Sequence, residues 1–62
     1  MPVVNLKIGK ITKDQKKEII EKVTATISEV TSIPKQAFVV VIEENDADNI
    51  GVGGVQLSER HK

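Results

Sequence analysis

Cysteine is absent from this chain and aromatic residues are nearly so. Without cysteine, disulfides and thiolate metal sites are excluded. Phe38 is the only aromatic residue, so base-stacking platforms are missing, and nine basic residues balance nine acidic ones, which leaves no basic face for phosphate groups. The single histidine, His61, lies one residue from the C-terminus, a poor position for a metal ligand. We therefore expect no metal, no cofactor and no nucleic-acid partner.

Long hydrophobic stretches are also missing. No segment approaches the roughly 20 apolar residues of a membrane span. The N-terminus lacks the charged segment and long apolar core of a signal peptide. These absences predict no membrane partner and a cytoplasmic location.

The length of 62 residues allows one domain, residues 1–62. A chain this short buries only about 60% of the surface that it exposes when unfolded, so a monomer would be marginally stable. Small domains usually gain stability from disulfides, metals or partner subunits. Because the first two are excluded, we expect a homo-oligomer.

The first stretch, "PVVNLKI" at residues 2–8, alternates between apolar and mixed positions. Val4, Leu6 and Ile8 fall on one face, which is the period of a strand with one face in the core. Pro2 shares the parity of that apolar face. Proline is tolerated as the first residue of a strand, so its position alone does not require a chemical role.

A helix is expected from about residue 12 to residue 31. Thr12 and Gln15 have the spacing of a capping box, in which each side chain bonds the other residue's backbone amide. Pro34 disfavours helical geometry in the residue before it and so closes the element. The apolar positions at helical spacing are Ile19, Ile20, Val23, Ile27 and Val30.

A second strand is expected over residues 37–43, "AFVVVIE", which is apolar without alternation and so predicts burial of both faces. Strand, helix and strand form a β-α-β unit with two parallel strands, and the crossover helix covers one face only. A partner must then cover the other face. The glycines in "IGVGG" at residues 50–54 predict a tight turn and a short C-terminal hairpin. The fold class is α+β.

The nitrogen of Pro2 has chemical potential if Met1 is removed. It is then a secondary amine at the end of a rigid strand, and burial disfavours its charged form and lowers its pKa. An amine whose pKa lies near neutrality is a suitable general base.

The opening "MPVVNLKI", the helical "DQKKEIIEKVTATI" and the closing "VVVIEENDADNIGVGG" resemble the 4-oxalocrotonate tautomerase family over essentially the whole chain. The resemblance implies the β-α-β tautomerase fold and a hexamer built as a trimer of dimers. It also implies that Pro2, freed of Met1, is the general base for enol–keto proton transfer. The implied substrate is a small unsaturated 2-hydroxy or 2-oxo acid such as 2-hydroxymuconate.

The same resemblance implies four substrate-binding positions, and three of them depart from the family pattern. Ile11 and Val39 fall where well-studied members carry carboxylate-binding arginines, and Ile50 replaces a pocket aromatic. Val52, in the glycine turn, is the fourth position. The departures leave two alternatives: a tautomerase of monocarboxylates such as phenylpyruvate, and a non-catalytic oligomeric scaffold. The lysines that could supply charge instead are Lys7, Lys10 and Lys35.

Overall fold

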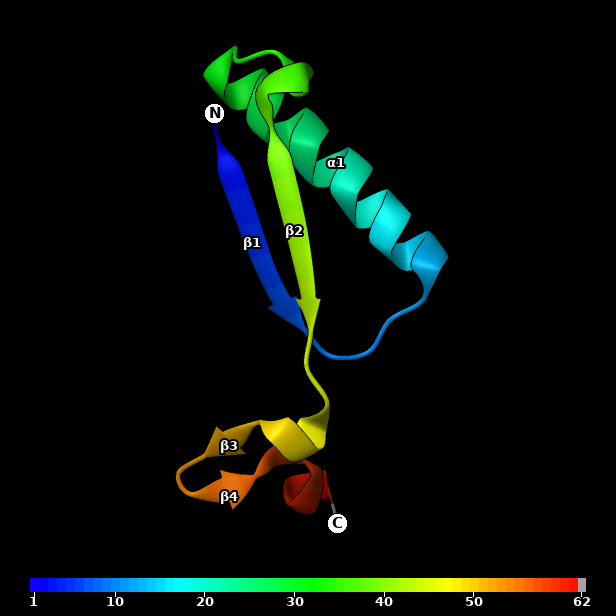
Figure 1. Cartoon of the computed structure of the whole chain (residues 1–62), viewed down its shortest axis with the longest axis vertical. Helices are drawn as coiled ribbons and strands as arrows, with labels where there is room; N and C mark the ends of the chain where they lie inside the picture. The colour runs from blue at the N-terminus through cyan, green and yellow to red at the C-terminus, as the bar shows by residue number, and fades with distance from the viewer. Residues whose placement is uncertain (62) are drawn as a thin grey trace.

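A computed structural model describes residues 1–61 as a two-stranded parallel sheet, one long helix and a separate C-terminal hairpin. Strand β1 (Val3–Ile8) pairs in parallel with β2 (Val39–Glu44), with Val3 opposite Val39 and Ile8 opposite Glu44. Helix α1 (Lys13–Thr31) connects them and lies along one face of the sheet (Figure 1). The predicted α+β class and β-α-β order are confirmed.

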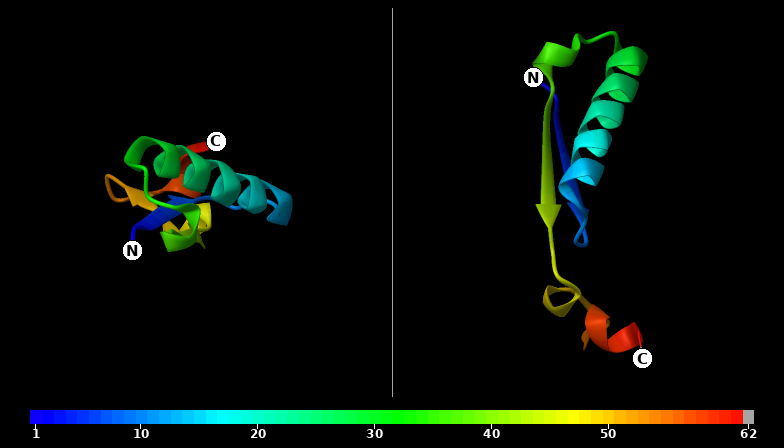
Figure 2. Two further views of the ribbon diagram at one scale, coloured as in Figure 1. Left: turned by 90° about the horizontal axis from the view of Figure 1, so that it is seen from above. Right: turned by 90° about the vertical axis from the view of Figure 1, so that its right-hand side faces the viewer.

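Strand β1 shows the alternation that its sequence predicts. Along the strand, Val4, Leu6 and Ile8 are half-buried, whereas Val3, Asn5 and Lys7 are exposed. Figure 2 shows α1 lying on one side of the sheet. The half-buried side chains of β1 are on the side that the helix covers, and the exposed ones are on the side that it leaves open. Pro2 shares the half-buried state of that side.

Helix α1 begins at the predicted capping box. The Thr12 hydroxyl accepts a hydrogen bond from the Gln15 backbone N–H at 3.1 Å, and the Gln15 side chain accepts one from the Thr12 N–H at 2.9 Å. Ile19, Val23 and Ile27, each four residues apart, are half-buried. Ile20 is 40% exposed and Val30 is 78% exposed, so these two members of the predicted apolar stripe lie off that row.

The second strand begins two residues later than predicted. After Pro34, residues 35–37 form the short 3-10 turn η1 (Lys35–Ala37), and β2 starts at Val39. The N–H of Phe38 donates to the carbonyl of Lys35 at 3.1 Å and closes this turn. The turn uses the fixed φ of Pro34 to bring the chain from the helix to the start of the sheet.

The predicted C-terminal hairpin consists of β3 (Gly51–Val52) and β4 (Val55–Gln56), which pair antiparallel. Gly53 and Gly54 have φ values of 61° and 83°, the left-handed geometry that two-residue hairpin loops require. Two further 3-10 turns, η2 (Ala47–Asn49) and η3 (Leu57–His61), flank the hairpin. Figure 1 shows this part standing apart from the sheet and helix.

The chain does not form a compact globule. A compact chain of this length has a radius of gyration of about 10.6 Å, whereas the observed value is 15.0 Å, with extents of 44 × 24 × 15 Å. Its accessible surface is 4977 Å², against about 3950 Å² for a monomer of this mass. No residue in the described part is fully buried. The uncovered face carries Val3, Val39 and Val41, which are 52%, 37% and 45% exposed.

Glu44, at the end of β2, holds the loop that precedes α1. Its carboxylate accepts a hydrogen bond from the Ile11 N–H at 3.0 Å and pairs with Lys16 at 3.0 Å. The Ile11 hydrogen bond first, and Lys16 second, lower the pKa of Glu44 below its ordinary value of 4.5. The two contacts thereby connect the far end of the sheet to the first turn of the helix.

We expect Glu44→Gln to make thermal stability less dependent on pH. Because the folded-state pKa is lowered, the stabilisation is complete above the unfolded-state pKa and is lost as the pH falls through the folded-state value. The wild type should therefore have the higher Tm at neutral pH, and the two Tm values should converge in acid. Melting at fixed protein concentration checks this. Glu21→Gln is the control, because Glu21 forms no hydrogen bond or ion pair among the described residues; a constant Tm difference for Glu44→Gln would contradict the assignment.

Candidate functional site

Pro2 lies at the open end of the sheet, where β1 begins. Its carbonyl accepts a hydrogen bond from the Val39 N–H at 3.0 Å, which extends the β1–β2 pairing by one step beyond Val3. Pro2 is half-buried on the helix side. The end of the chain is therefore held by the sheet, and the ring of Pro2 further restricts where its nitrogen points.

Met1 makes no comparable packing contribution. It is 88% exposed, and the strand begins only after Pro2. While Met1 is attached, the Pro2 nitrogen is an amide without basicity. Removal of Met1 would convert it to a secondary amine and leave the Pro2–Val39 hydrogen bond intact, because that bond uses the Pro2 carbonyl.

Phe38 and Lys35 share this end of the sheet, and the sequence pattern did not place them there. Continuing the parallel register by one residue sets Phe38 opposite Pro2. Phe38 is half-buried, and η1, which carries Lys35, lies beside the N-terminus in Figure 1. The parallel pairing brings them to Pro2 from more than thirty residues away, a relation that no local spacing encodes.

Val39 is the only one of the four predicted substrate-binding positions that lies beside Pro2 within the chain. Its backbone bonds Pro2, and its side chain is 37% exposed on the face that α1 leaves open. The position next to the proposed base thus carries an aliphatic side chain with no charge for a carboxylate.

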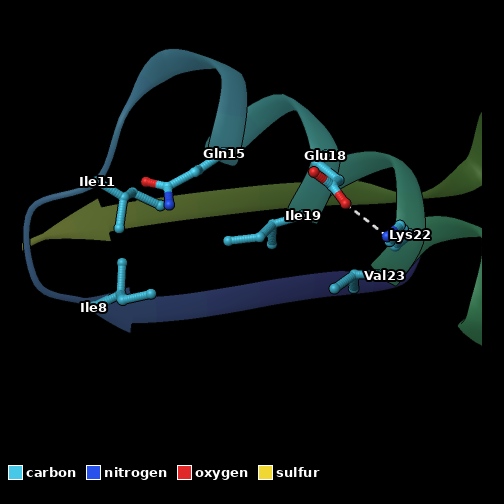
Figure 3. A pocket seen from close by; sticks show the side chains of 7 residues that line it. All are labelled: Ile8, Ile11, Gln15, Glu18, Ile19, Lys22 and Val23. Atoms are coloured by element: carbon cyan, nitrogen blue, oxygen red, sulfur yellow. Dashed lines mark hydrogen bonds and ion pairs between the residues drawn. The ribbon is translucent and has the colours of Figure 1, made fainter.

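Ile11 lies at the opposite end of the sheet. It lines an apolar cleft of about 430 Å³ between β1 and the first half of α1, and Figure 3 shows Ile8 and Ile11 pointing toward one another across it. The six residues of β1 separate Ile8, beside Ile11, from Pro2 by roughly 20 Å at the usual rise of a strand. Ile11 and Pro2 are therefore separate places on one chain. The other lining residues are Gln15, Glu18, Ile19, Lys22 and Val23.

Ile50 and Val52 belong to the C-terminal hairpin region. Ile50 accepts a hydrogen bond from the Leu57 N–H at 2.7 Å, which ties the two arms of this region together. Val52 is 47% exposed in β3. Figure 1 places the hairpin beyond the end of the sheet opposite to Pro2. One pocket that combines Pro2 with Ile11, Ile50 and Val52 would need more than one copy of the chain.

A second, polar hollow of about 230 Å³ lies at the same far end, lined by Lys10, Glu44, Asn45, Asp46 and Asn49. Among the residues that the structure describes, no group of three or more histidine or acidic side chains is arranged to hold a metal ion. The side chain of His61 lies outside the described part. No helix within residues 1–61 has the length and hydropathy needed to span a membrane.

Comparison with known proteins decides the family. The family described as "Tautomerase enzyme" matches residues 2–60. The chain belongs to the tautomerase family. This tautomerase is 45% identical over 62 residues to a probable tautomerase of Bacillus cereus, covering 97% of this chain and 100% of that protein. It is 39% identical to the 2-hydroxymuconate tautomerase of Bacillus subtilis, covering 95% and 97% of the two chains.

The fold of this tautomerase agrees with a solved relative. YwhB, a homologue of 4-oxalocrotonate tautomerase, superposes with a TM-score of 0.86 at 37% identity, covering 94% of this chain and 97% of the other. The resemblance read from "MPVVNLKI" and "IGVGG" is thereby confirmed. The protein is an enzyme of the isomerase class with tautomerase activity.

Proposed function

We propose that this tautomerase catalyses enol–keto proton transfer on a small 2-hydroxy or 2-oxo acid, with the nitrogen of Pro2 as general base. In this reaction the prolyl amine takes the proton from the enol hydroxyl as the C=O bond forms. The resulting prolyl ammonium then gives a proton to the carbon two atoms away, where the C–H bond forms. The amine is regenerated, and no atom is gained or lost.

The observation that carries this proposal is the position of Pro2. It immediately precedes β1, is half-buried, and is anchored by the Val39 N–H through its carbonyl, so its nitrogen would be free to react once Met1 is removed. The exposed Met1 is accessible for removal. A base held at a fixed position typically accelerates proton transfer by about 10²–10⁴-fold. An assay of enol–keto conversion with protein whose N-terminus is verified by intact mass tests the proposal.

Assembly into a hexamer is part of this proposal. The chain is too extended for its length, and Val3, Val39 and Val41 form an uncovered apolar face. Contiguous exposed apolar surface marks a site of protein association. Assembly would cover this face, which includes Val3 at the start of β1. It would also bring Ile11, Ile50 or Val52 of neighbouring copies toward Pro2.

The substrate follows from which charges are present. A dicarboxylate such as 2-hydroxymuconate, the substrate in the name of the Bacillus subtilis relative, carries a carboxylate at each end. Arginine binds a carboxylate through two parallel hydrogen bonds, which Ile11 and Val39 cannot make. Arg60, in η3, is the only arginine of the chain. This deficit favours the second candidate, a monocarboxylate such as the enol of phenylpyruvate.

We expect Val39→Arg to improve turnover of 2-hydroxymuconate. A hydrogen bond to a charged group contributes about 1.5–3 kcal/mol, which corresponds to roughly one to two decades in kcat/KM. The gain should appear mainly as a lower KM in steady-state kinetics. Val39→Gln is the matched control, since it supplies length and polarity without charge. Equal behaviour of the arginine and glutamine variants would show that position 39 does not face the substrate carboxylate.

A further inference from the structure

We propose that Lys35 is the cation that binds the substrate carboxylate at the Pro2 site, which makes an enol acid with one carboxylate the preferred substrate. This inference rests on the proposed function of Pro2. It assigns a binding role to a residue that stands more than thirty positions from Pro2 in the sequence and next to it in the fold.

Two backbone hydrogen bonds place Lys35 near Pro2. The Val39 N–H donates to Pro2 at 3.0 Å, and the Phe38 N–H donates to Lys35 at 3.1 Å. The spacing of paired strands and the rise of a 3-10 turn put the Lys35 Cα no more than about 11 Å from that of Pro2. A lysine side chain, with its four-carbon stem, can cross much of that interval and meet a ligand held between the two residues.

The charge of Lys35 is available for a ligand. Lys35 is exposed, and its ammonium forms no hydrogen bond or ion pair with any described residue. By contrast, Lys16 and Lys22 are paired with Glu44 and Glu18. An ammonium is a compact point charge with three donors, and it can bind one carboxylate without the fixed two-pronged geometry of arginine.

The other unpaired candidates lie elsewhere on the chain. Lys7 stands near the far end of β1, in register with Glu43. Lys10 lines the polar hollow together with Glu44 and Asp46. Lys7 is the fifth residue of β1 and Lys10 follows the end of that strand, so both lie toward the end of the sheet opposite to Pro2. Of the three lysines Lys7, Lys10 and Lys35, Lys35 is therefore the one placed to act with Pro2 within a single chain.

The neighbours of Lys35 indicate what the rest of the ligand should be. Phe38 is half-buried and shares the side of the sheet on which Pro2 lies, whereas the next residue, Val39, faces the opposite side. A single ammonium beside an aromatic side chain suits a molecule with one carboxylate and an apolar remainder. The enol of phenylpyruvate has this composition, whereas a dicarboxylate would leave its second charge without a partner.

The test compares the enol of phenylpyruvate with the enol of its methyl ester, a neutral analogue, in the assembled protein lacking Met1. Lys35→Ala should raise KM for the acid about ten- to hundredfold and change kcat much less. KM for the ester should not change, and Lys35→Arg should restore most of the binding of the acid. Lys17→Ala, which removes an exposed lysine of α1 that forms no ion pair with a described residue, is the matched control and should bind the acid like the wild type.

Two results would overturn the role of Lys35: an unchanged KM for the acid in Lys35→Ala, or an equal rise for acid and ester. Loss of acid binding in Lys10→Ala or Arg60→Ala, with Lys35→Ala unaffected, would likewise overturn it and assign the cation to a neighbouring copy. Pro2→Ala, assayed in parallel, separates the two proposals. If Pro2→Ala is fully active, the base is elsewhere; if it is inactive while Lys35→Ala is normal, only the role of Lys35 fails.

Discussion

Replacing Pro2 by alanine is expected to remove most of the activity while the protein remains assembled. Alanine also allows removal of Met1, but it presents a freely rotating primary amine in place of a secondary amine held in a ring. The loss of a positioned base typically costs about 10²–10⁴-fold in rate. The residual amine should keep the loss toward the lower part of that range. Steady-state kinetics with an enol substrate, together with light scattering of the same sample, measure both effects.

Pro34→Ala is the control for this experiment. It replaces the other proline of the chain, which is exposed and caps η1, and leaves the N-terminal amine unchanged. In the wild type, kcat/KM should rise with pH through a single ionisation, because the amine must be unprotonated to act as a base. The pKa of that ionisation should lie below the pKa of an ordinary prolyl amine, since burial disfavours the ammonium. Full activity of Pro2→Ala, or an equal loss in Pro34→Ala, would contradict the assignment.

Val41→Asp is expected to prevent assembly and to unfold the chain. Val41 is 45% exposed in the middle of β2, on the face that α1 leaves uncovered. If that face is buried between subunits, the new carboxylate is an unpaired charge in an apolar interface, which costs about 3–5 kcal/mol per site. Since no described residue is fully buried within the single chain, the separated subunit lacks a core to keep it folded.

Sedimentation and circular dichroism at micromolar concentration measure this outcome. The wild type should sediment as a hexamer, and Val41→Asp should lose both the hexamer and most of its helical signal. Val41→Ala is the matched control, because it truncates the side chain without adding charge and should stay assembled at a lower Tm. A wild-type chain that is a stable folded monomer, or a Val41→Asp protein that still forms the hexamer, would show that this face is not the interface.

The fold could be predicted from the sequence because its signals are local. The alternation of Val4, Leu6 and Ile8 gave the orientation of β1, and the Thr12–Gln15 pair gave the start of α1. The start of the second strand was predicted less accurately. Residues 35–37 form a 3-10 turn that the apolar pattern does not reveal, so β2 begins at Val39 and not at residue 37. Ile20 and Val30 were assigned to the apolar stripe by spacing alone, although α1 leaves both exposed.

The candidate site was harder to predict because it depends on contacts between distant segments. The location of Pro2 at the end of a strand follows from its position in the sequence. The sequence named Lys35 only as one of three lysines that could supply charge, and the parallel pairing that sets the start of β2 beside Pro2 distinguishes it from the other two. Ile11, Ile50 and Val52 lie far from Pro2 within one chain, and periodicity carries no information about the symmetry that would bring copies together.

The most direct test of the central role of Pro2 compares two preparations of the same sequence, one lacking Met1 and one retaining it, each verified by intact mass. Both should form the same assembly, because Met1 is exposed and the Pro2 carbonyl makes the strand contact in either case. The kcat/KM for an enol acid is the measured quantity. We predict that the preparation without Met1 is active and that the preparation retaining Met1 is nearly inactive. Equal activity in the two preparations would show that the base is another residue and that the nitrogen of Pro2 has no part in the reaction.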